Sequence, residues 1–140
     1  MELLVRINSI EIMEKKTEIQ KRLDSFGYAF KGVKDLFLTQ RNAQIHLTIS
    51  IIVIVAAYFF NISKTEWLIC ILLIGLVLAA EAINTALEYL TDLVSPDYHE
   101  LAGKSKDVAA AGVLLLAIVA AIIGVSIFWQ PVIELIFGNS

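Results

Sequence analysis

The sequence predicts an all-α integral membrane protein, and three observations lead to this prediction. Apolar residues make up 58% of the chain, against roughly 45–50% in an average soluble domain. The mean hydropathy is +0.76, which is high for a water-soluble fold. The apolar residues collect in three blocks, and a helix that crosses a bilayer needs about 20 of them. We therefore expect three transmembrane helices, at roughly residues 45–61, 67–93 and 107–129.

Size and charge narrow the class of protein further. A chain of 140 residues builds one domain or one small membrane bundle. Its formal net charge of −3 argues against a nucleic-acid-binding protein that relies on general basicity. The single cysteine, Cys70, excludes an internal disulfide framework and a cysteine-rich metal site.

The segment before the first span predicts a helix on the membrane surface. Phe26, Phe30, Val33 and Phe37 recur at spacings of four, three and four residues, which places them on one helical face. Such a face suits an amphipathic helix in the membrane interface, and the alternative is an ordinary helix that faces a protein core. The expected domains are a charged, helical N-terminal extension (1–22), the membrane domain (23–130) and a short C-terminal tail (131–140).

Basic residues predict the orientation in the membrane. Eight of the 11 lysines and arginines precede residue 42, and cytoplasmic loops carry an excess of such residues. The expected loop of residues 61–66 holds one basic residue, that of residues 95–107 holds two, and the tail after Trp129 holds none. We therefore expect a cytoplasmic N-terminus and an external C-terminus. Because Arg6 interrupts the first short apolar run, no cleavable signal peptide is expected.

The most informative segment is a polar stripe on the second span. Five residues fall within roughly 100° of one another on a helix: Glu81, Asn84, Thr85, Glu88 and Asp92. An ionisable group inside a span is expensive and marks a functional site by default. A solvated helix end is the alternative explanation. It fits Asp92 well but Glu81 poorly, because 13 apolar residues precede Glu81.

The stripe suits phosphate chemistry at a membrane surface. Mg²⁺ binds oxygen ligands, commonly one or two carboxylates together with phosphate oxygens and water. A carboxylate at the edge of the hydrocarbon suits a general base that works near neutral pH. Glu81 lies about 10 Å deeper than Glu88, at 1.5 Å per residue. One helix would therefore reach from a water-soluble phosphate donor to the hydroxyl group of a lipid.

A second polar cluster precedes the third apolar block and contains His99, Gly103, Lys106 and Asp107. Lys106 offers positive charge to a phosphate, and the start of the following helix favours anions. A loop that only sets the membrane topology would explain the lysines. It would not require the histidine, the glycine and the aspartate as well.

These motifs resemble those of the prokaryotic diacylglycerol kinase family, which includes the bacterial undecaprenol kinases. The strongest similarity lies in Glu81-Ala-Ile-Asn-Thr-Ala-Leu-Glu88, then Asp92, then His99-Glu-Leu-Ala-Gly-Lys-Ser-Lys-Asp107. Ser25-Phe-Gly-Tyr-Ala-Phe-Lys-Gly32 and Arg41-Asn-Ala-Gln-Ile-His46 resemble the family's leading helix and the start of its first span. The resemblance runs from about Lys21 to Phe128.

The resemblance implies a homotrimer of three-span subunits in the bacterial inner membrane, with active sites between subunits. It implies transfer of the ATP γ-phosphate to a lipid alcohol, with Mg²⁺ as cofactor. By position, Glu81 matches the catalytic base and Glu88 a metal ligand. The positions that match nucleotide contacts are Tyr28, Glu88, Asp97, Tyr98, His99, Lys106 and Asp107. The positions that match supporting or lipid-binding residues are Lys21, Asn84 and Asp92.

One residue departs from the family pattern. Gln40 stands where many members have a glutamate that also binds metal. A glutamine carbonyl can bind Mg²⁺, but it brings no charge. The alternative is that Gln40 only packs beside Arg41 and Asn42 at the membrane surface.

The sequence leaves alternatives open for the identity of the lipid substrate and for the activity. His99-Glu-Leu-Ala-Gly resembles the branch that phosphorylates diacylglycerol, whereas Arg41-Asn-x-x-Ile-His resembles the undecaprenol branch. A non-catalytic membrane scaffold or regulatory subunit is the main alternative to a kinase. A subunit of a proton-coupled transporter would also use an intramembrane carboxylate, but it would leave Lys106 and Asp107 without a purpose.

Overall fold

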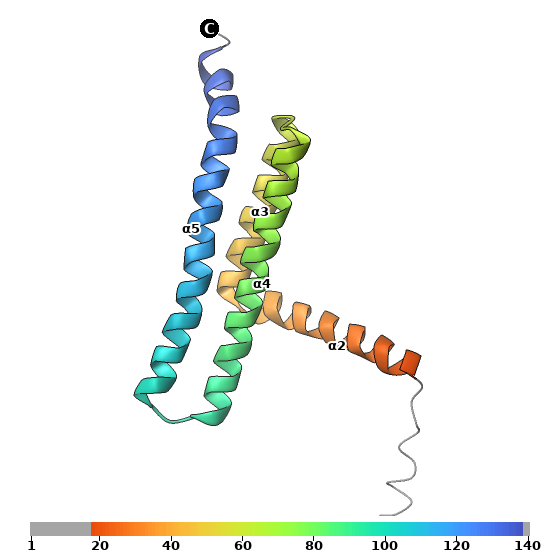
Figure 1. The fold of residues 1–140 in the computed structure, drawn as a ribbon, viewed down its shortest axis with the longest axis vertical. Coiled ribbons are helices and arrows are strands. Elements are labelled where there is room, and N and C mark those ends of the chain that lie inside the picture. The colour runs from red at the N-terminus through yellow and green to blue at the C-terminus, as the bar shows by residue number, and fades with distance from the viewer. Residues whose placement is uncertain (1–17, 139–140) are drawn as a thin grey trace, which may run out of the picture. The chain divides into compact units, whose positions relative to one another are not determined.

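The computed structural model describes residues 18–138, and the regular structure in that range is helical throughout. The helices are α2 (Glu18–Thr39), α3 (Arg41–Phe59), α4 (Lys64–Val94) and α5 (Glu100–Phe137) (Figure 1). The chain forms two compact units that divide between Asp35 and Leu36, within α2. The predicted all-α class with three long apolar helices is confirmed. The helix expected over residues 1–17 lies outside the described residues.

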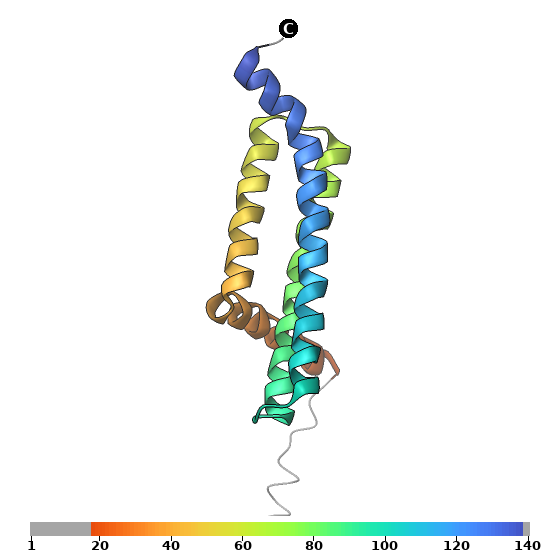
Figure 2. The same ribbon diagram turned by 90° about the vertical axis from the view of Figure 1, so that its left-hand side faces the viewer.

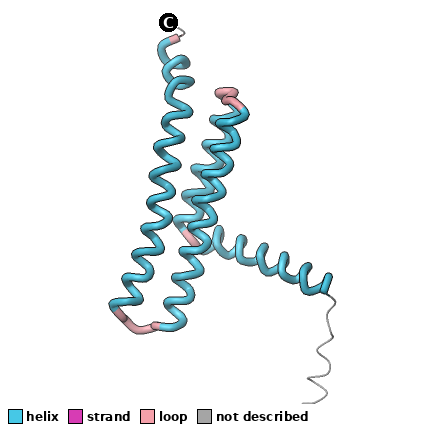
Figure 3. Tube along the Cα trace, in the orientation of Figure 1, coloured by secondary structure: helices cyan, strands magenta, loops and turns pink. Residues whose placement is uncertain are grey.

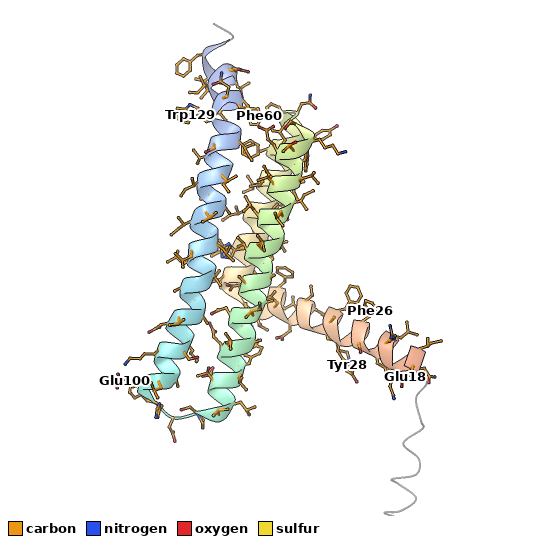
Figure 4. All side chains as sticks on the ribbon, in the orientation of Figure 1. Glu18, Phe26, Tyr28, Phe60, Glu100 and Trp129 are labelled. Atoms are coloured by element: carbon orange, nitrogen blue, oxygen red, sulfur yellow. The ribbon has the colours of Figure 1, made fainter. Side chains whose placement is uncertain are left out.

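The part of α2 in the first unit carries exposed aromatic side chains. Phe26 is 67% exposed, and Figure 4 shows Phe26 and Tyr28 projecting from different sides of the helix. The Lys21 Nζ lies 2.8 Å from the Glu18 Oε1, and the Lys31 Nζ lies 5.6 Å from the centre of the Tyr28 ring. The predicted helix is present. Its place in the membrane interface stays a prediction.

The three helices of the second unit are long enough to cross a membrane. α3 has 19 residues, α4 has 31 and α5 has 38, with mean hydropathies of 1.7, 2.3 and 2.9 in their most apolar windows. They run side by side in alternating directions and are joined by short loops (Figures 2 and 3). The backbone of α4 lies close to those of both α3 and α5, whereas the described backbones of α3 and α5 lie farther from each other. α4 is therefore the central helix of this unit.

Local sequence signals set the ends of α4. The Glu66 N–H donates to the Ser63 Oγ (3.3 Å), and the Ser63 N–H donates to the Glu66 Oε2 (2.7 Å). This reciprocal pair is a capping box, which starts a helix by satisfying its free N–H groups. α4 ends at Val94, just ahead of Ser95-Pro96, because proline disfavours the helical conformation at the residue before it.

α5 is longer than the sequence predicted. It begins at Glu100, inside the segment that was expected to be a loop, and continues through Pro131 to Phe137. The His99 Nδ1 accepts a hydrogen bond from the Leu101 N–H (3.2 Å) and caps the start of the helix. Proline removes one backbone hydrogen bond from a helix, and in α5 this loss does not end the helix.

The buried apolar core of the described chain is small. It consists of Leu36, Ala43, Ala57, Cys70, Val77 and Val113. Phe60 packs against Phe128 with ring centres 6.2 Å apart, at the end of the bundle where Figure 4 labels Phe60 and Trp129. Glu100 lies at the opposite end, and we call these the Phe60 end and the Glu100 end. Most apolar side chains face outward, as in a protein whose solvent is lipid, and the chain is a multi-pass membrane protein.

Candidate active site

Three polar side chains of α4 are buried inside the bundle. Glu81, Asn84 and Thr85 are only 2%, 4% and 5% exposed. The apolar side chains of Ile83 and Leu90, on other faces of the same helix, are exposed. A membrane helix that turns its carboxylate inward and its apolar groups outward places the costly group where a partner can satisfy it.

Several oxygens of this buried group have no partner. The Glu81 Oε2, the Asn84 Oδ1 and the Thr85 Oγ1 are buried without a hydrogen bond to any described residue. Leaving a buried polar atom unsatisfied costs about 1–3 kcal/mol, and native proteins seldom do so without a reason. The three oxygens are therefore positioned to receive donors from a ligand, from water or from a second subunit.

A small pocket of about 170 Å³ lies beside Glu81 and Asn84. α3 contributes Asn42 and His46, and α4 contributes Glu81 and Asn84. The remaining lining comes from α5: Ala110, Val113, Leu114 and Ala117. The pocket therefore has a polar side, formed by two helices, and an apolar side, formed by the third.

A larger apolar groove of about 450 Å³ adjoins this pocket. His46 and Ala117 line both spaces, so the polar pocket and the groove are neighbours. On α5 the groove is lined from Ala117 to Phe128, a distance of about 16 Å along the helix at 1.5 Å per residue. Within the groove the Ser50 Oγ donates to the His46 carbonyl oxygen of its own helix (2.7 Å). The groove therefore offers a hydrocarbon surface that runs toward the Phe60 end.

Toward the Glu100 end the polar stripe continues through paired groups. The Asn84 Nδ2 donates to the Glu88 Oε1 (2.9 Å). The Lys106 Nζ of α5 donates to the Asp92 Oδ1 of α4 (2.5 Å), and the two groups form an ion pair. This ion pair ties α4 to α5 beside the connection that holds Asp97, Tyr98 and His99.

Gln40, at the junction of α2 and α3, reaches across to α4. Its Nε2 donates to the Tyr89 Oη (3.1 Å) and to the Thr39 Oγ1 (3.3 Å). The Thr39 and Tyr89 hydroxyl oxygens lie 3.2 Å apart. Gln40 is therefore held by an interhelical hydrogen-bond cluster, beyond the surface packing with Arg41 and Asn42 that sequence reasoning offered as its alternative.

The donor set fits a metal that is shared with a nucleotide. Among residues 18–138, no group of three or more histidine, cysteine, aspartate or glutamate side chains gathers into a metal cage. Mg²⁺ in phosphate-transfer sites is held by one or two carboxylates plus substrate phosphates, without an all-protein cage. The Glu88 carboxylate, with one oxygen bonded to Asn84, and the Gln40 carbonyl are donors of the right kind.

The structure unites part of the predicted site. Glu81 and Asn84 share the pocket, Asn84 is bonded to Glu88, and Asp92 is bonded to Lys106. Three further predicted residues lie at the Glu100 end, in the α4–α5 connection: Asp97, Tyr98 and His99. Asp107 lies exposed on α5. Lys21 and Tyr28 lie on the part of α2 that belongs to the first unit.

Sequence reasoning missed residues that α3 and α4 bring to the site. Asn42 and His46 line the pocket, and Tyr89 bonds Gln40. The signal for His46 was its position as a polar residue inside the first apolar block. Tyr89 gave no such signal, because tyrosine is ordinary near the end of a membrane helix.

The structure is a helical membrane bundle with a buried carboxylate and an adjoining apolar groove. A lysine–aspartate pair lies at one end. This combination suits a membrane protein whose substrate has both a polar group and a hydrocarbon chain. The model of the family described as prokaryotic diacylglycerol kinase matches residues 27–128, and the chain belongs to this family. It is therefore an ATP-dependent lipid kinase of the diacylglycerol and undecaprenol kinase type. The resemblance drawn from the sequence motifs is confirmed.

Individual relatives agree with the family. The chain is 35% identical to an undecaprenol kinase of Bacillus subtilis, over 82% of this chain and 94% of the relative. It is 43% identical to a diacylglycerol kinase of Synechocystis, over 81% of this chain, although the match spans only 65% of that longer relative. It is 26% identical to a diacylglycerol kinase of Escherichia coli, over 81% of this chain and 93% of the relative.

Proposed function

We propose that the chain transfers the γ-phosphate of ATP to the hydroxyl group of a membrane lipid alcohol, with Glu81 as the general base. The observation that carries this proposal is the unpartnered Glu81 Oε2 beside a pocket that adjoins an apolar groove. The pocket offers an acceptor for a hydroxyl proton. The groove offers a surface for the hydrocarbon attached to that hydroxyl.

In this mechanism Glu81 accepts the proton as the lipid oxygen attacks the γ-phosphorus. The bond from the γ-phosphorus to the bridging oxygen breaks, and ADP leaves with the electron pair. A positioned general base typically contributes about 10²–10⁴-fold to the rate. Asn84 lies between Glu81 and Glu88 and is bonded to Glu88, so it links the base to the proposed metal ligand.

The nucleotide binds toward the Glu100 end in this proposal. Lys106 exchanges Asp92 for a phosphate oxygen, because phosphoryl transfer depends mainly on positioning and charge neutralisation. Glu88, with Gln40 as a neutral ligand, would hold Mg²⁺, which would supply neutralisation of the phosphate charge. The other proposed nucleotide contacts are Tyr28, Asp97, Tyr98, His99 and Asp107, with Lys21 proposed near the lipid.

Two lipid alcohols suit the groove, diacylglycerol and undecaprenol, and relatives named for each are known. A direct test presents both lipids side by side to the purified protein in vesicles with labelled ATP and Mg²⁺. Phosphate transfer to one or both is expected. If neither lipid is phosphorylated while the protein remains folded, the proposed lipid substrates are wrong.

We further propose a homotrimer in the bacterial inner membrane, with α2 on the cytoplasmic surface and the Glu100 end facing the cytoplasm. The basic residues before residue 42 and the outward-facing apolar side chains support this arrangement. In a Cys70→Ala background, Ser95→Cys should react with a membrane-impermeant thiol reagent only after cells are opened. Ile62→Cys should react in intact cells, and the reverse pattern would overturn the orientation.

A further inference from the structure

The Gln40 side chain does not cap α3, although Gln40 stands at the start of that helix. Gln40 is the N-cap residue of α3, yet its side chain makes no capping hydrogen bond. Serine, threonine, aspartate or asparagine at this position typically stabilises a helix by about 1 kcal/mol. A long amide that leaves the helix end uncapped and reaches α4 points to a use other than helix stability.

The hydrogen bonds of Gln40 fix which way its amide faces. A glutamine amide has two N–H donors and one carbonyl acceptor. The nitrogen contacts both hydroxyl oxygens, the Tyr89 Oη at 3.1 Å and the Thr39 Oγ1 at 3.3 Å. The carbonyl oxygen therefore points away from the two hydroxyls, and no described residue donates a hydrogen bond to it.

This orientation matters more for an amide than for a carboxylate. A carboxylate presents an oxygen whichever way it turns about its last bond. An amide presents either a carbonyl oxygen, which attracts a cation, or an N–H₂ group, which repels one. A neutral ligand therefore needs an orienting partner that a charged ligand does not need, in the way that outer groups orient many metal ligands.

We propose that Tyr89 is a positioning residue that turns the Gln40 amide so that its carbonyl oxygen faces the divalent cation of the nucleotide site. Thr39 assists by accepting the second N–H. The proposal rests on the proposed function, because it takes the metal–nucleotide complex to bind beside Glu88. It assigns Tyr89 no contact with substrate or metal.

The test is a double-mutant cycle on the full-length protein, with Mn²⁺ as the probe. Mn²⁺ binding in the presence of ATP is measured by electron paramagnetic resonance, without any lipid. Tyr89→Phe removes only the hydroxyl and should weaken Mn²⁺ binding by about tenfold, the low end for loss of an orienting partner. In the Gln40→Glu background the same change should alter Mn²⁺ affinity much less, because either oxygen of a carboxylate can face the ion.

Matched controls separate positioning from structure. Tyr58→Phe removes the same hydroxyl from an exposed tyrosine at the far end of α3 and should leave Mn²⁺ binding unchanged. Thr39→Val should cause a smaller loss than Tyr89→Phe, because its bond to Gln40 is longer. Thermal unfolding of each variant reports whether the bundle is intact.

Two results would overturn the inference. Unchanged Mn²⁺ affinity in Tyr89→Phe would mean that the Gln40 carbonyl does not face the ion. An equal loss in the Gln40 and Gln40→Glu backgrounds would mean that Tyr89 acts on the fold. Neither result depends on lipid turnover, so failure of this inference is distinguishable from failure of the kinase proposal.

Discussion

The polar pocket at Glu81 and the apolar groove beside it are built from the same three helices, yet they have opposite chemistry. The pocket of about 170 Å³ presents Asn42, His46, Glu81 and Asn84. The groove of about 450 Å³ is lined almost wholly by apolar side chains. The difference follows the composition of α4, which is apolar from Leu68 to Ala80 and polar from Glu81 onward. In the proposed function the pocket holds the base and the groove holds the lipid chain, so reactivity and lipid binding can each be altered alone.

The largest effect is expected when the negative charge of the pocket is removed and its shape is kept. Glu81→Gln keeps the size of the side chain but removes the base. We expect turnover to fall by about 10²–10⁴-fold, with ATP affinity within about twofold and an unchanged unfolding temperature. Phosphate transfer in vesicles and nucleotide binding measure the two effects. Turnover within a few-fold of the parent protein would remove Glu81 as the base.

The next effect lies at the Glu100 end, where charge rather than shape is tested. Lys106→Met should weaken ATP binding by about ten- to a hundredfold, since hydrogen bonds to charged groups contribute about 1.5–3 kcal/mol. The matched control is Lys104→Met, because Lys104 pairs with Glu100 on an exposed face of the same helix (2.6 Å). ATP binding by calorimetry should be unchanged in the control. Equal losses in both variants would point to general charge instead of a specific contact.

The groove can be filled without disturbing the pocket. A Cβ atom at Gly124 would meet no heavy atom within 4 Å, and Gly124 lines the groove, so we expect Gly124→Leu to fold and to occupy the groove. We expect KM for a long-chain lipid alcohol to rise about tenfold, because buried hydrocarbon contributes about 0.8 kcal/mol per CH₂. KM for a short-chain analogue and for ATP should not change.

The control for the groove lies on the same helix. Ser126 is about 200° around α5 from Gly124, is exposed, and does not line the groove. Ser126→Leu should therefore leave both lipids' KM values unchanged. If Gly124→Leu instead breaks up the oligomer in detergent, the groove is covered by a second copy and does not hold a lipid chain.

The smallest expected effect concerns charge at the metal. Gln40→Glu adds a negative ligand, so the Mg²⁺ concentration for half-maximal activity should fall several-fold, because hard cations prefer charged oxygens. The maximal rate should change less. Gln44→Glu is the control, since it adds the same charge one turn away, where the Gln44 Nε2 donates to the Phe37 carbonyl oxygen (3.0 Å). A magnesium titration at saturating ATP in which both variants match the parent would place Gln40 outside the metal's ligands.

The sequence predicted correctly those features that depend on a residue and its neighbours in the chain. Glu81 stood out because a carboxylate after a long apolar run is expensive in a membrane, and the structure places it 2% exposed beside a pocket. The end of α4 was predictable from Pro96 for a local reason. These inferences needed only neighbours in the chain.

The missed features depend on contacts between distant residues. The bond of Gln40 to Tyr89 spans 49 positions, and no local pattern announces it. α5 was predicted to start too late, because Lys104 and Lys106 looked like loop residues. In the structure Lys104 pairs with Glu100 one turn earlier, a spacing that supports a helix.

α4 is one unbroken helix from Lys64 to Val94, and this continuity fixes the distances between its polar groups along the helix axis. The vertical offset between Glu81 and Asp92 is fixed at about 16 Å by the rise of the helix, and no hinge in the helix adjusts it. In the proposed mechanism a substrate is then selected by the depth of its hydroxyl group in the bilayer more than by its shape. An alcohol whose hydroxyl group lies too near the surface or too deep in the bilayer would not reach the Glu81 carboxylate, even if its chain fits the groove. Bilayer thickness thereby becomes a variable of the reaction, alongside the concentrations of the two substrates.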